Sequence, residues 1–268
     1  MYPVLLKLGP IEIHAYGLLL AVSFMVGIYW AMARAPRRGI SKNDILDLSI
    51  FVVLGAIIGS RLLYVVTHLE EFRGRWLDTI NPIQSTGEVG ISGLSMLGGV
   101  VMVIAIIAFY CRRKHISFPR LCDVLAPVFA LGIMLTRIGC FLNGCCFGIP
   151  GDMPWCMVFP EHSPAGSVLL GVHIHPAQLY SSLYGLIILV VILLLDRKER
   201  PDGFLMSVFF MLYGVARFGI DFVRYYETSV QIRFAGQIFT INQAISFAMF
   251  LAGLIFLIRI RTRKDTTT

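Results

Sequence analysis

Seven long apolar runs alternate with short polar segments along the chain. The runs cover residues 16–33, 45–66, 94–110, 121–142, 176–195, 204–222 and 237–258. A helix needs roughly 20 apolar residues to cross a hydrocarbon core of about 30 Å, and each run is close to that length. The pattern predicts an all-α integral membrane protein with seven transmembrane helices.

The basic residues indicate how these helices are oriented. Most of the 23 basic residues fall in four clusters: Arg34/Arg37/Arg38/Lys42, Arg112/Arg113/Lys114/Arg120, Arg197/Lys198/Arg200 and Arg259/Arg261/Arg263/Lys264. Each cluster flanks an apolar run, and every second gap is nearly free of basic residues. Because cytoplasmic loops carry the excess of Lys and Arg, we expect the N-terminus outside and the C-terminus in the cytoplasm.

The first apolar run is expected to stay in the mature protein. Only Lys7 precedes it, whereas four basic residues follow it. A cleavable signal peptide has the opposite bias, with its positive charge before the apolar stretch. No long linker or internal repeat divides the chain, so residues 1–268 are expected to form a single transmembrane domain.

Composition agrees with lipid as the solvent for much of the chain. Of the 268 residues, 57% are hydrophobic and 15% are charged, and the mean hydropathy is +0.77. A soluble domain would carry about 25% charged residues. The net charge of +7 is concentrated in the clusters beside the helices, so it indicates membrane topology and argues against a nucleic-acid partner.

The segment 143–175 is the longest glycine- and proline-rich connection, and it is predicted to lie outside. It contains Trp155 and Phe159, which suit the boundary between lipid and water. Such a loop is expected to act as a lid or an interfacial dock. A simple connection with aromatic anchors fits the pattern equally well.

Two arginines within apolar runs are the strongest functional signal. Arg137 and Arg217 lie near the predicted outer ends of their runs. A guanidinium at membrane depth is costly unless an anion or a cavity receives it. Their placement predicts a pocket for an anionic lipid headgroup, although snorkelling to the interface would also explain them.

Further polar residues fall at the same predicted face and suit a phosphate site. Arg61 and Arg224 are candidate phosphate donors, and Tyr16 and His14 are candidate hydrogen-bond donors. Asp221 follows Arg217 by one helical turn and is expected to pair with it. The alternative roles are an aromatic anchor for Tyr16 and a helix-start position for His14 or His175.

These motifs make the chain similar to the prolipoprotein diacylglyceryl transferase family. The resemblance runs from the H-x-Y-G opening to the Y-G-x-x-R-F stretch and the Gln237–Ser246 segment. The family signature G-R-x-G-N-F-x-N-x-E-x-x-G is matched at Arg137, Gly139, Phe141, Asn143 and Gly148. Thr136, Cys140 and Cys145 replace its usual Gly, Asn and Glu. Leu97 and Ser181 stand where the family usually has His and Glu.

The resemblance implies a transferase of a bacterial inner membrane, multi-pass, with its active site on the periplasmic side. Members move the diacylglyceryl group of phosphatidylglycerol onto the lipobox cysteine of a prolipoprotein and release glycerol 1-phosphate. The expected partners are phosphatidylglycerol, the prolipoprotein signal peptide with its lipobox, and the bilayer. No cofactor is expected. The resemblance assigns catalysis to Arg137, Arg217, Tyr16 and His14, and substrate binding to Arg137, Asn143, Gly144, Arg61, Arg224 and Asp221.

The cysteines depart from the family pattern and leave three states open. Cys140, Cys145, Cys146 and Cys156 lie in or beside the predicted outer loop. A disulfide of Cys140 or Cys145 with Cys156 suits an oxidising compartment, and unpaired thiols are the second possibility. A metal site is the third, but the spacing C-x4-C-C lacks the usual C-x2-C knuckle, so no metal is expected among the site residues.

Two other functions stay open beside the transferase. The substitutions at Leu97, Cys140 and Cys145 suit a degenerate relative that binds phospholipid or modifies another acceptor. The outer cysteines suit a transporter or a thiol-redox membrane protein. A transporter would be expected to show repeat symmetry or ionisable residues at mid-membrane depth, and the sequence shows little of either.

Overall fold

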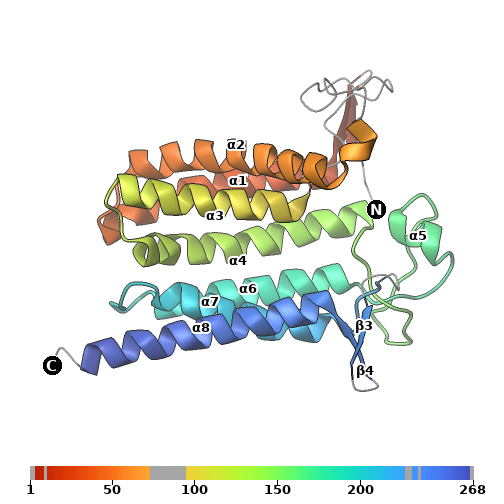
Figure 1. Cartoon of the computed structure of the whole chain (residues 1–268). Helices are drawn as coiled ribbons and strands as arrows, with labels where there is room; N and C mark the ends of the chain where they lie inside the picture. Colours follow the sequence, from red (N-terminus) through yellow and green to blue (C-terminus); the bar gives the residue numbers. More distant parts are fainter. Residues whose placement is uncertain (1–3, 9–10, 73–94, 227–230, 235–236, 266–268) are drawn as a thin grey trace. The chain divides into compact units, whose positions relative to one another are not determined.

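The computed structural model describes residues 4–8, 11–72, 95–226, 231–234 and 237–265 (Figure 1). Two compact units are distinguished: unit 1 comprises Met1–Ala31 and Cys122–Thr268, and unit 2 comprises Met32–Leu121. The unit boundaries fall inside two helices, α1 (Ala15–Arg34) and α4 (Phe118–Asn143), and most of each helix belongs to unit 1. The other elements of unit 1 are β1 (Val4–Leu8), β2 (Ile11–His14), α5 (Pro164–Val168), α6 (Ala177–Leu195), α7 (Phe204–Ile220), β3 (Gln231–Phe234), β4 (Gln237–Thr240) and α8 (Ile241–Asp265). Unit 2 contains a 3-10 turn at Ala35–Arg38, α2 (Lys42–Thr67), a second turn at Leu69–Phe72 and α3 (Met96–Arg113).

Six of the described helices are long and apolar enough to cross a membrane: α1, α2, α3, α4, α6 and α8. The helix α7 is also apolar but has only 17 residues. The protein is therefore a multi-pass membrane protein with a helical membrane part. The seventh span and the orientation of the termini stay predictions.

The described residues contain two short β-hairpins beside the helices, whereas the sequence predicted an all-α chain. β1 pairs with β2 and β3 pairs with β4, each as an antiparallel hairpin. The predicted last span began at residue 237, but β4 occupies Gln237–Thr240 and α8 begins at Ile241. The apolar pattern could not find this boundary, because Ile238 and Phe239 of the strand are as apolar as the helix that follows.

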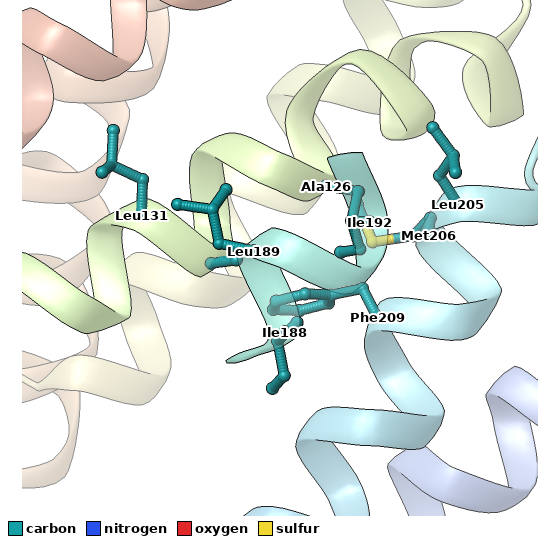
Figure 2. Packing of buried hydrophobic residues seen from close by; sticks show 9 residues of the cluster. Ala126, Leu131, Ile188, Leu189, Ile192, Leu205, Met206 and Phe209 are labelled. Carbon is teal, nitrogen blue, oxygen red and sulfur yellow. The ribbon is translucent and has the colours of Figure 1, made fainter. Parts of the chain in front are cut away.

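The core of unit 1 lies between α4, α6 and α7. Ala126 and Leu131 of α4 pack with Ile188 and Ile192 of α6 and with Phe209 of α7 (Figure 2). Asp123, fully buried on α4, accepts hydrogen bonds from the N–H groups of Gly203 (2.9 Å) and Met206 (3.0 Å). A carboxylate at the start of α7 satisfies N–H groups that have no partner within that helix, so it fixes α4 against α7.

In unit 2, small residues let α2 and α3 approach closely. Gly59 of the sequence Gly55-Ala-Ile-Ile-Gly59 faces Gly98 of α3, and a Cβ added to Gly59 would lie 2.6 Å from the Gly98 carbonyl oxygen. The same Cβ would lie 2.4 Å from the Cβ of Met102. Helices in lipid associate mainly through such close packing, because lipid tails are as apolar as the helix surfaces.

We predict that Gly59→Ala lowers the thermal stability of the protein in detergent. The added methyl group meets backbone and Cβ atoms that cannot rotate away, and overpacking of this kind costs about 1–3 kcal/mol. The matched control is Gly219→Ala, since a Cβ at Gly219 would meet no atom within 4 Å. Equal melting temperatures for the two variants would contradict the close α2–α3 contact.

Candidate functional site

The end of α4 folds back on itself and places two cysteines together. The Cys145 N–H donates to the Cys140 carbonyl (3.1 Å), and the Gly144 N–H donates to the Phe141 carbonyl (3.1 Å). Gly144 has φ +74°, a left-handed backbone that glycine adopts without steric cost. This is the Schellman arrangement of a helix C-terminus. The predicted substrate-binding residue Gly144 is thus the turn residue, and both its N–H and its carbonyl (to Ala165 N–H, 3.1 Å) are already engaged.

The three thiols of Cys140, Cys145 and Cys146 form one cluster, with all three Sγ atoms within 4.8 Å of one another. We refer to these residues as the thiol cluster. Cys146 has φ +59°, which is rare for a residue other than glycine. Among the described residues no disulfide involves the four cysteines near the loop, and Cys156 is a free thiol as well. The disulfide of Cys156 with Cys140 or Cys145, one of the three states that the sequence left open, is therefore not formed in this structure.

The residues after the thiol cluster lie between two other backbone segments. The Gly148 N–H donates to the His175 carbonyl (3.0 Å), and the Ile149 N–H donates to the Val223 carbonyl (2.9 Å). A Cβ on Gly148 would lie 2.5 Å from the His175 oxygen and 2.7 Å from the Val223 oxygen, so only glycine fits. Gly148 also forms a β-bridge with Arg224. These contacts bring Arg224 to the thiol cluster.

The spacing of seven residues between Arg217 and Arg224 predicts that they share one face of a helix, and this prediction is wrong. The helix α7 ends at Ile220, and Arg224 follows in the bridge with Gly148. Its guanidinium lies over the Tyr226 ring, with the Cζ atom 5.1 Å from the ring centroid. The Nε atom of Arg224 is buried and has no hydrogen-bond partner among the described residues.

Arg137 is half-buried on α4 among tyrosines and thiols. Its charge interacts with Tyr184 of α6, Tyr213 of α7, and Cys140 and Cys146. Within the described part of the chain, no carboxylate pairs with Arg137 and no hydrogen bond reaches it. The positive charge of Arg137 is therefore not neutralised by a described acidic group.

Tyr16 lies beside the same part of α4. A Cβ on Gly139 would be 3.4 Å from the Tyr16 Cα and 3.5 Å from its ring atom Cδ2. The Tyr16 phenol interacts electrostatically with the three cysteines of the thiol cluster and with Arg137. The structure thus brings together Tyr16 and Arg137, two of the four predicted catalytic residues, from α1 and α4.

Arg217 is buried and fully paired. Its Nη1 forms an ion pair with Asp221 Oδ1, and its Nη2 donates to the Tyr226 hydroxyl (2.6 Å). The Tyr226 hydroxyl in turn donates to Asp221 Oδ1 (2.7 Å). The predicted pairing of Asp221 with Arg217 is confirmed.

The same carboxylate connects α7 to the start of α8. The Thr240 hydroxyl donates to Asp221 Oδ2. Thr240 is also the N-cap of α8: its Oγ1 accepts from the Gln243 N–H (3.1 Å), and its own N–H donates to Gln243 Oε1 (3.0 Å). This reciprocal pair is a capping box. The Arg217 side chain is thereby held by Asp221 and Tyr226, and Thr240 at the end of β4 holds Asp221 in turn.

The two arginines converge on one pair of tyrosines. Tyr184 interacts with the charges of both Arg137 and Arg217, and Tyr213 interacts with both as well. The two rings meet edge to face, with centroids 6.1 Å apart. Residues 80 positions apart in the sequence are therefore parts of one site in unit 1.

The remaining predicted site residues are Arg61, His14 and Asn143. Arg61 belongs to unit 2, where it is buried and lies over the rings of Tyr64 (5.9 Å) and Phe72 (5.1 Å). The side chain of His14 lies outside the described residues, although its backbone pairs with Val4. Asn143 ends α4 and its side chain interacts with the Cys145 thiol.

The positive charges affect the cysteines that lie beyond the end of α4. Hydrogen bonds with Cys140 and Cys145 lower the pKa of the Cys146 thiol, and the charges of Arg224 and Arg137 lower it further against the effect of burial. The hydrogen bond with Cys140 also lowers the pKa of Cys145, but the hydrogen bond with Cys146 and burial outweigh it and raise that pKa. Negative charge in the cluster is thus favoured at Cys146.

The loop 143–175 is folded around a small core of its own. Phe147, Phe159, Ala165 and Ile174 are buried together. Trp155 is 56% exposed, and its indole N–H donates to the Tyr180 hydroxyl (2.6 Å). Figure 1 shows α5 and the β3–β4 hairpin at the same end of unit 1 as the C-terminus of α4. A role as lid or interfacial dock stays a prediction.

Several residues of the site were not predicted. Tyr184, Tyr213 and Tyr226 surround the arginines, and Gln178 donates to the Cys145 carbonyl (2.8 Å) while fully buried. A sequence signal existed for two of them. Tyr213 precedes Arg217 by one helical turn, and Gln178 is a polar residue at the start of a very apolar helix.

The fold and the site define a multi-pass membrane protein that gathers arginines, tyrosines and thiols at one end of its helices. Residues 3–259 match the family described as prolipoprotein diacylglyceryl transferase. The chain therefore belongs to the prolipoprotein diacylglyceryl transferase family.

Individual relatives agree over nearly the whole chain. A protein of Bordetella avium (strain 197N), named phosphatidylglycerol–prolipoprotein diacylglyceryl transferase, is 34% identical and the match covers 98% of this chain and 96% of the relative. A protein of the same name from Geobacter sulfurreducens is 32% identical, with 98% and 96% covered. Another from Aliivibrio salmonicida is 34% identical, with 96% and 86% covered.

We predict that Asp221→Ala destabilises the protein strongly. Arg217 and Asp221 are only 7% and 6% exposed, and removing one partner of a buried ion pair costs about 3–5 kcal/mol. The matched control is Asp152→Ala, an exposed carboxylate for which a change within about 0.5 kcal/mol is expected. Thermal unfolding in detergent measures both variants. A loss for Asp221→Ala no larger than that of the control would show that the ion pair does not hold the site together.

Proposed function

We propose that this protein transfers the diacylglyceryl group of phosphatidylglycerol to the lipobox cysteine thiol of prolipoproteins and releases glycerol 1-phosphate. The reaction takes place at the outer leaflet of a bacterial inner membrane. The chain crosses that membrane seven times, with the N-terminus outside, the C-terminus in the cytoplasm and the site facing the periplasm. The family membership and the relatives' names support this proposal.

The observation that carries the proposal is the state of Arg137. It is a permanent cation near the end of an apolar helix, and no carboxylate among the described residues neutralises it. Such a group needs an anion from elsewhere. A lipid phosphate at the membrane surface supplies one.

The reaction increases the negative charge on the phosphate, and the guanidinium groups of Arg137 and Arg224 are suited to stabilise that increase. The phosphodiester of phosphatidylglycerol carries one negative charge, and the phosphate monoester that leaves carries about 1.5–2. Charge therefore grows on the phosphate oxygens as the ester bond breaks. Cations held in place before the reaction stabilise such charge most effectively.

Arg217 has a different part in this proposal. Since Asp221 neutralises it, Arg217 adds little net charge, but its guanidinium is fixed beside Tyr184 and Tyr213. It serves to orient the phosphate or glycerol oxygens through the phenols. Tyr16 and Asn143 add polar groups to these surroundings, and His14 is proposed as a further hydrogen-bond donor. Asp221 and Gly144 hold the site in shape.

The lipobox thiol that accepts the diacylglyceryl group must lose a proton. The two residues that could act as a general base in the family pattern are replaced in this chain. Leu97 opens α3 where the resemblance expects histidine, and Cys145 stands where it expects glutamate. A free thiol with a pKa of about 8.5 is only a few per cent thiolate near neutral pH. The site therefore needs another means of activating the thiol.

We predict that the purified chain releases glycerol phosphate when given phosphatidylglycerol and a lipobox peptide, and that Arg137→Ala lowers this rate by about 10²–10³. No ion pair or hydrogen bond with a described residue holds Arg137, so the variant is expected to fold normally. The matched control is Arg197→Ala, an exposed arginine beyond the other end of α6, which should keep the wild-type rate. Wild-type transfer by Arg137→Ala would remove Arg137 from the reaction.

The same assay separates the other two functions. Binding of phosphatidylglycerol without release of glycerol phosphate would support an accessory or degenerate relative. Neither binding nor release, together with an activity that depends on the cysteines, would support a transporter or a thiol-redox protein.

A further inference from the structure

We propose that Cys140, Cys145 and Cys146 bind a zinc ion and leave its fourth position open, and that the thiol to be modified binds there. The zinc site follows from the thiol cluster alone. The role of the open position rests on the proposed function.

The geometry of the thiol cluster suits zinc. Zinc binds thiolates at about 2.3 Å in a tetrahedron, which places the sulfur atoms about 3.8 Å apart. The three Sγ atoms already lie within 4.8 Å of one another, so a small inward movement completes the coordination. Three protein ligands and one open position are typical of a catalytic zinc site, whereas structural sites have four.

The backbone removes the objection raised by the C-x4-C-C spacing. Adjacent residues in extended chain direct their side chains apart, so Cys145 and Cys146 would not be expected to share one ion. Here the turn after α4 returns Cys145 to Cys140, and Cys146 adopts φ +59°. Such a conformation in a non-glycine residue is costly and is found preferentially at functional sites.

The surrounding charges also fit. Zinc with three thiolates carries one net negative charge, and a fourth thiolate raises this to two. Arg137 and Arg224 act on the cluster with positive charge. They therefore offset the negative charge of the occupied site, in the same way that they would offset a phosphate.

Neighbouring groups hold the ligands in position. The Asn143 side chain interacts with the Cys145 thiol. The Gln178 amide donates to the Cys145 carbonyl (2.8 Å) and is fully buried. Such surrounding hydrogen bonds orient metal ligands and affect affinity strongly. Cys140 is buried, while Cys145 and Cys146 are half-buried, which leaves one side of the cluster accessible.

A zinc ion supplies the activation that the missing base would otherwise give. A thiol that coordinates zinc is deprotonated outright, and its proton goes to solvent. The zinc-bound sulfur then attacks the glyceryl carbon that bears the phosphate. The new C–S bond forms, the C–O bond breaks, and its electron pair goes to the departing phosphate oxygen beside Arg137.

Direct attack by Cys146 is not a workable alternative. It would form a thioether between the enzyme and the lipid, and a thioether has no good leaving group. The chain would be consumed after one turnover. A metal ligand does not meet this difficulty.

The first test is the zinc content of the full chain, purified in detergent with a tag that does not bind metal. About one zinc per chain is expected by elemental analysis. Cys140→Ser, Cys145→Ser and Cys146→Ser should each lose most of it, whereas Cys156→Ser should retain it. A mercurial thiol reagent should release the zinc from the wild-type chain, which avoids any folding defect of the variants. Zinc-free wild-type protein that does not take up zinc would overturn the site.

The second test asks whether the acceptor thiol binds the metal. In cobalt-substituted protein the sulfur-to-cobalt absorption should rise by about one third when a lipobox peptide is added, because a fourth thiolate joins three. The same peptide with Ser in place of Cys should cause no change. An identical spectrum with both peptides would overturn the acceptor role.

The two proposals fail in different ways. Metal content and cobalt spectra require no turnover, so zinc binding without any release of glycerol phosphate would count against the transferase and not against the site. Conversely, if zinc activates the thiol, removing zinc should lower transfer by about 10²–10⁴, the range for loss of proton-transfer catalysis. Full transfer by zinc-free protein would overturn the inference while the proposed transferase stands.

Discussion

The cost of keeping guanidinium groups within apolar surroundings determines how this site is built. A buried cation needs an anion, and the protein meets this need differently at two positions. Arg217 receives Asp221, and the carboxylate is itself held by Tyr226 and by the N-cap of α8. Arg137 receives no described carboxylate, so its charge is available to a ligand. In the proposed function, Arg217 therefore serves to hold the site together and Arg137 serves to bind the anion.

The return of the chain after α4 is the second element on which the site depends. A glycine at position 144 allows the turn, and a glycine at 148 lets the chain pass between the carbonyls of His175 and Val223. Residues from α4, the loop and the segment after α7 thereby become neighbours. Backbone hydrogen bonds make these contacts, and the stacking of Phe147 on Tyr225 adds side-chain packing between the same two segments.

The cysteines give this member of the family side chains whose ligand preferences differ from those of the pattern it resembles. An amide and a carboxylate are hard oxygen ligands or proton carriers, whereas thiolates prefer soft ions such as zinc. Replacing a glutamate by Cys145 also removes a fixed negative charge close to Arg137. The zinc site would restore negative charge at that place and would supply the thiol activation that Leu97 does not.

The sequence by itself determined the helical membrane part, because apolar runs of about 20 residues flanked by basic residues are typical of transmembrane helices. It also singled out Arg137 and Arg217 as candidate site residues. It predicted the i, i+4 pairing of Arg217 with Asp221, since one helical turn brings such residues together. It did not reveal the β4 boundary, the separation of Arg224 from α7 or the gathering of three thiols. Those features depend on where α4 and α7 end and on which backbone segments then pair. Only the tertiary structure decides that, because the pairing joins residues such as Gly148 and Arg224 that no local pattern connects.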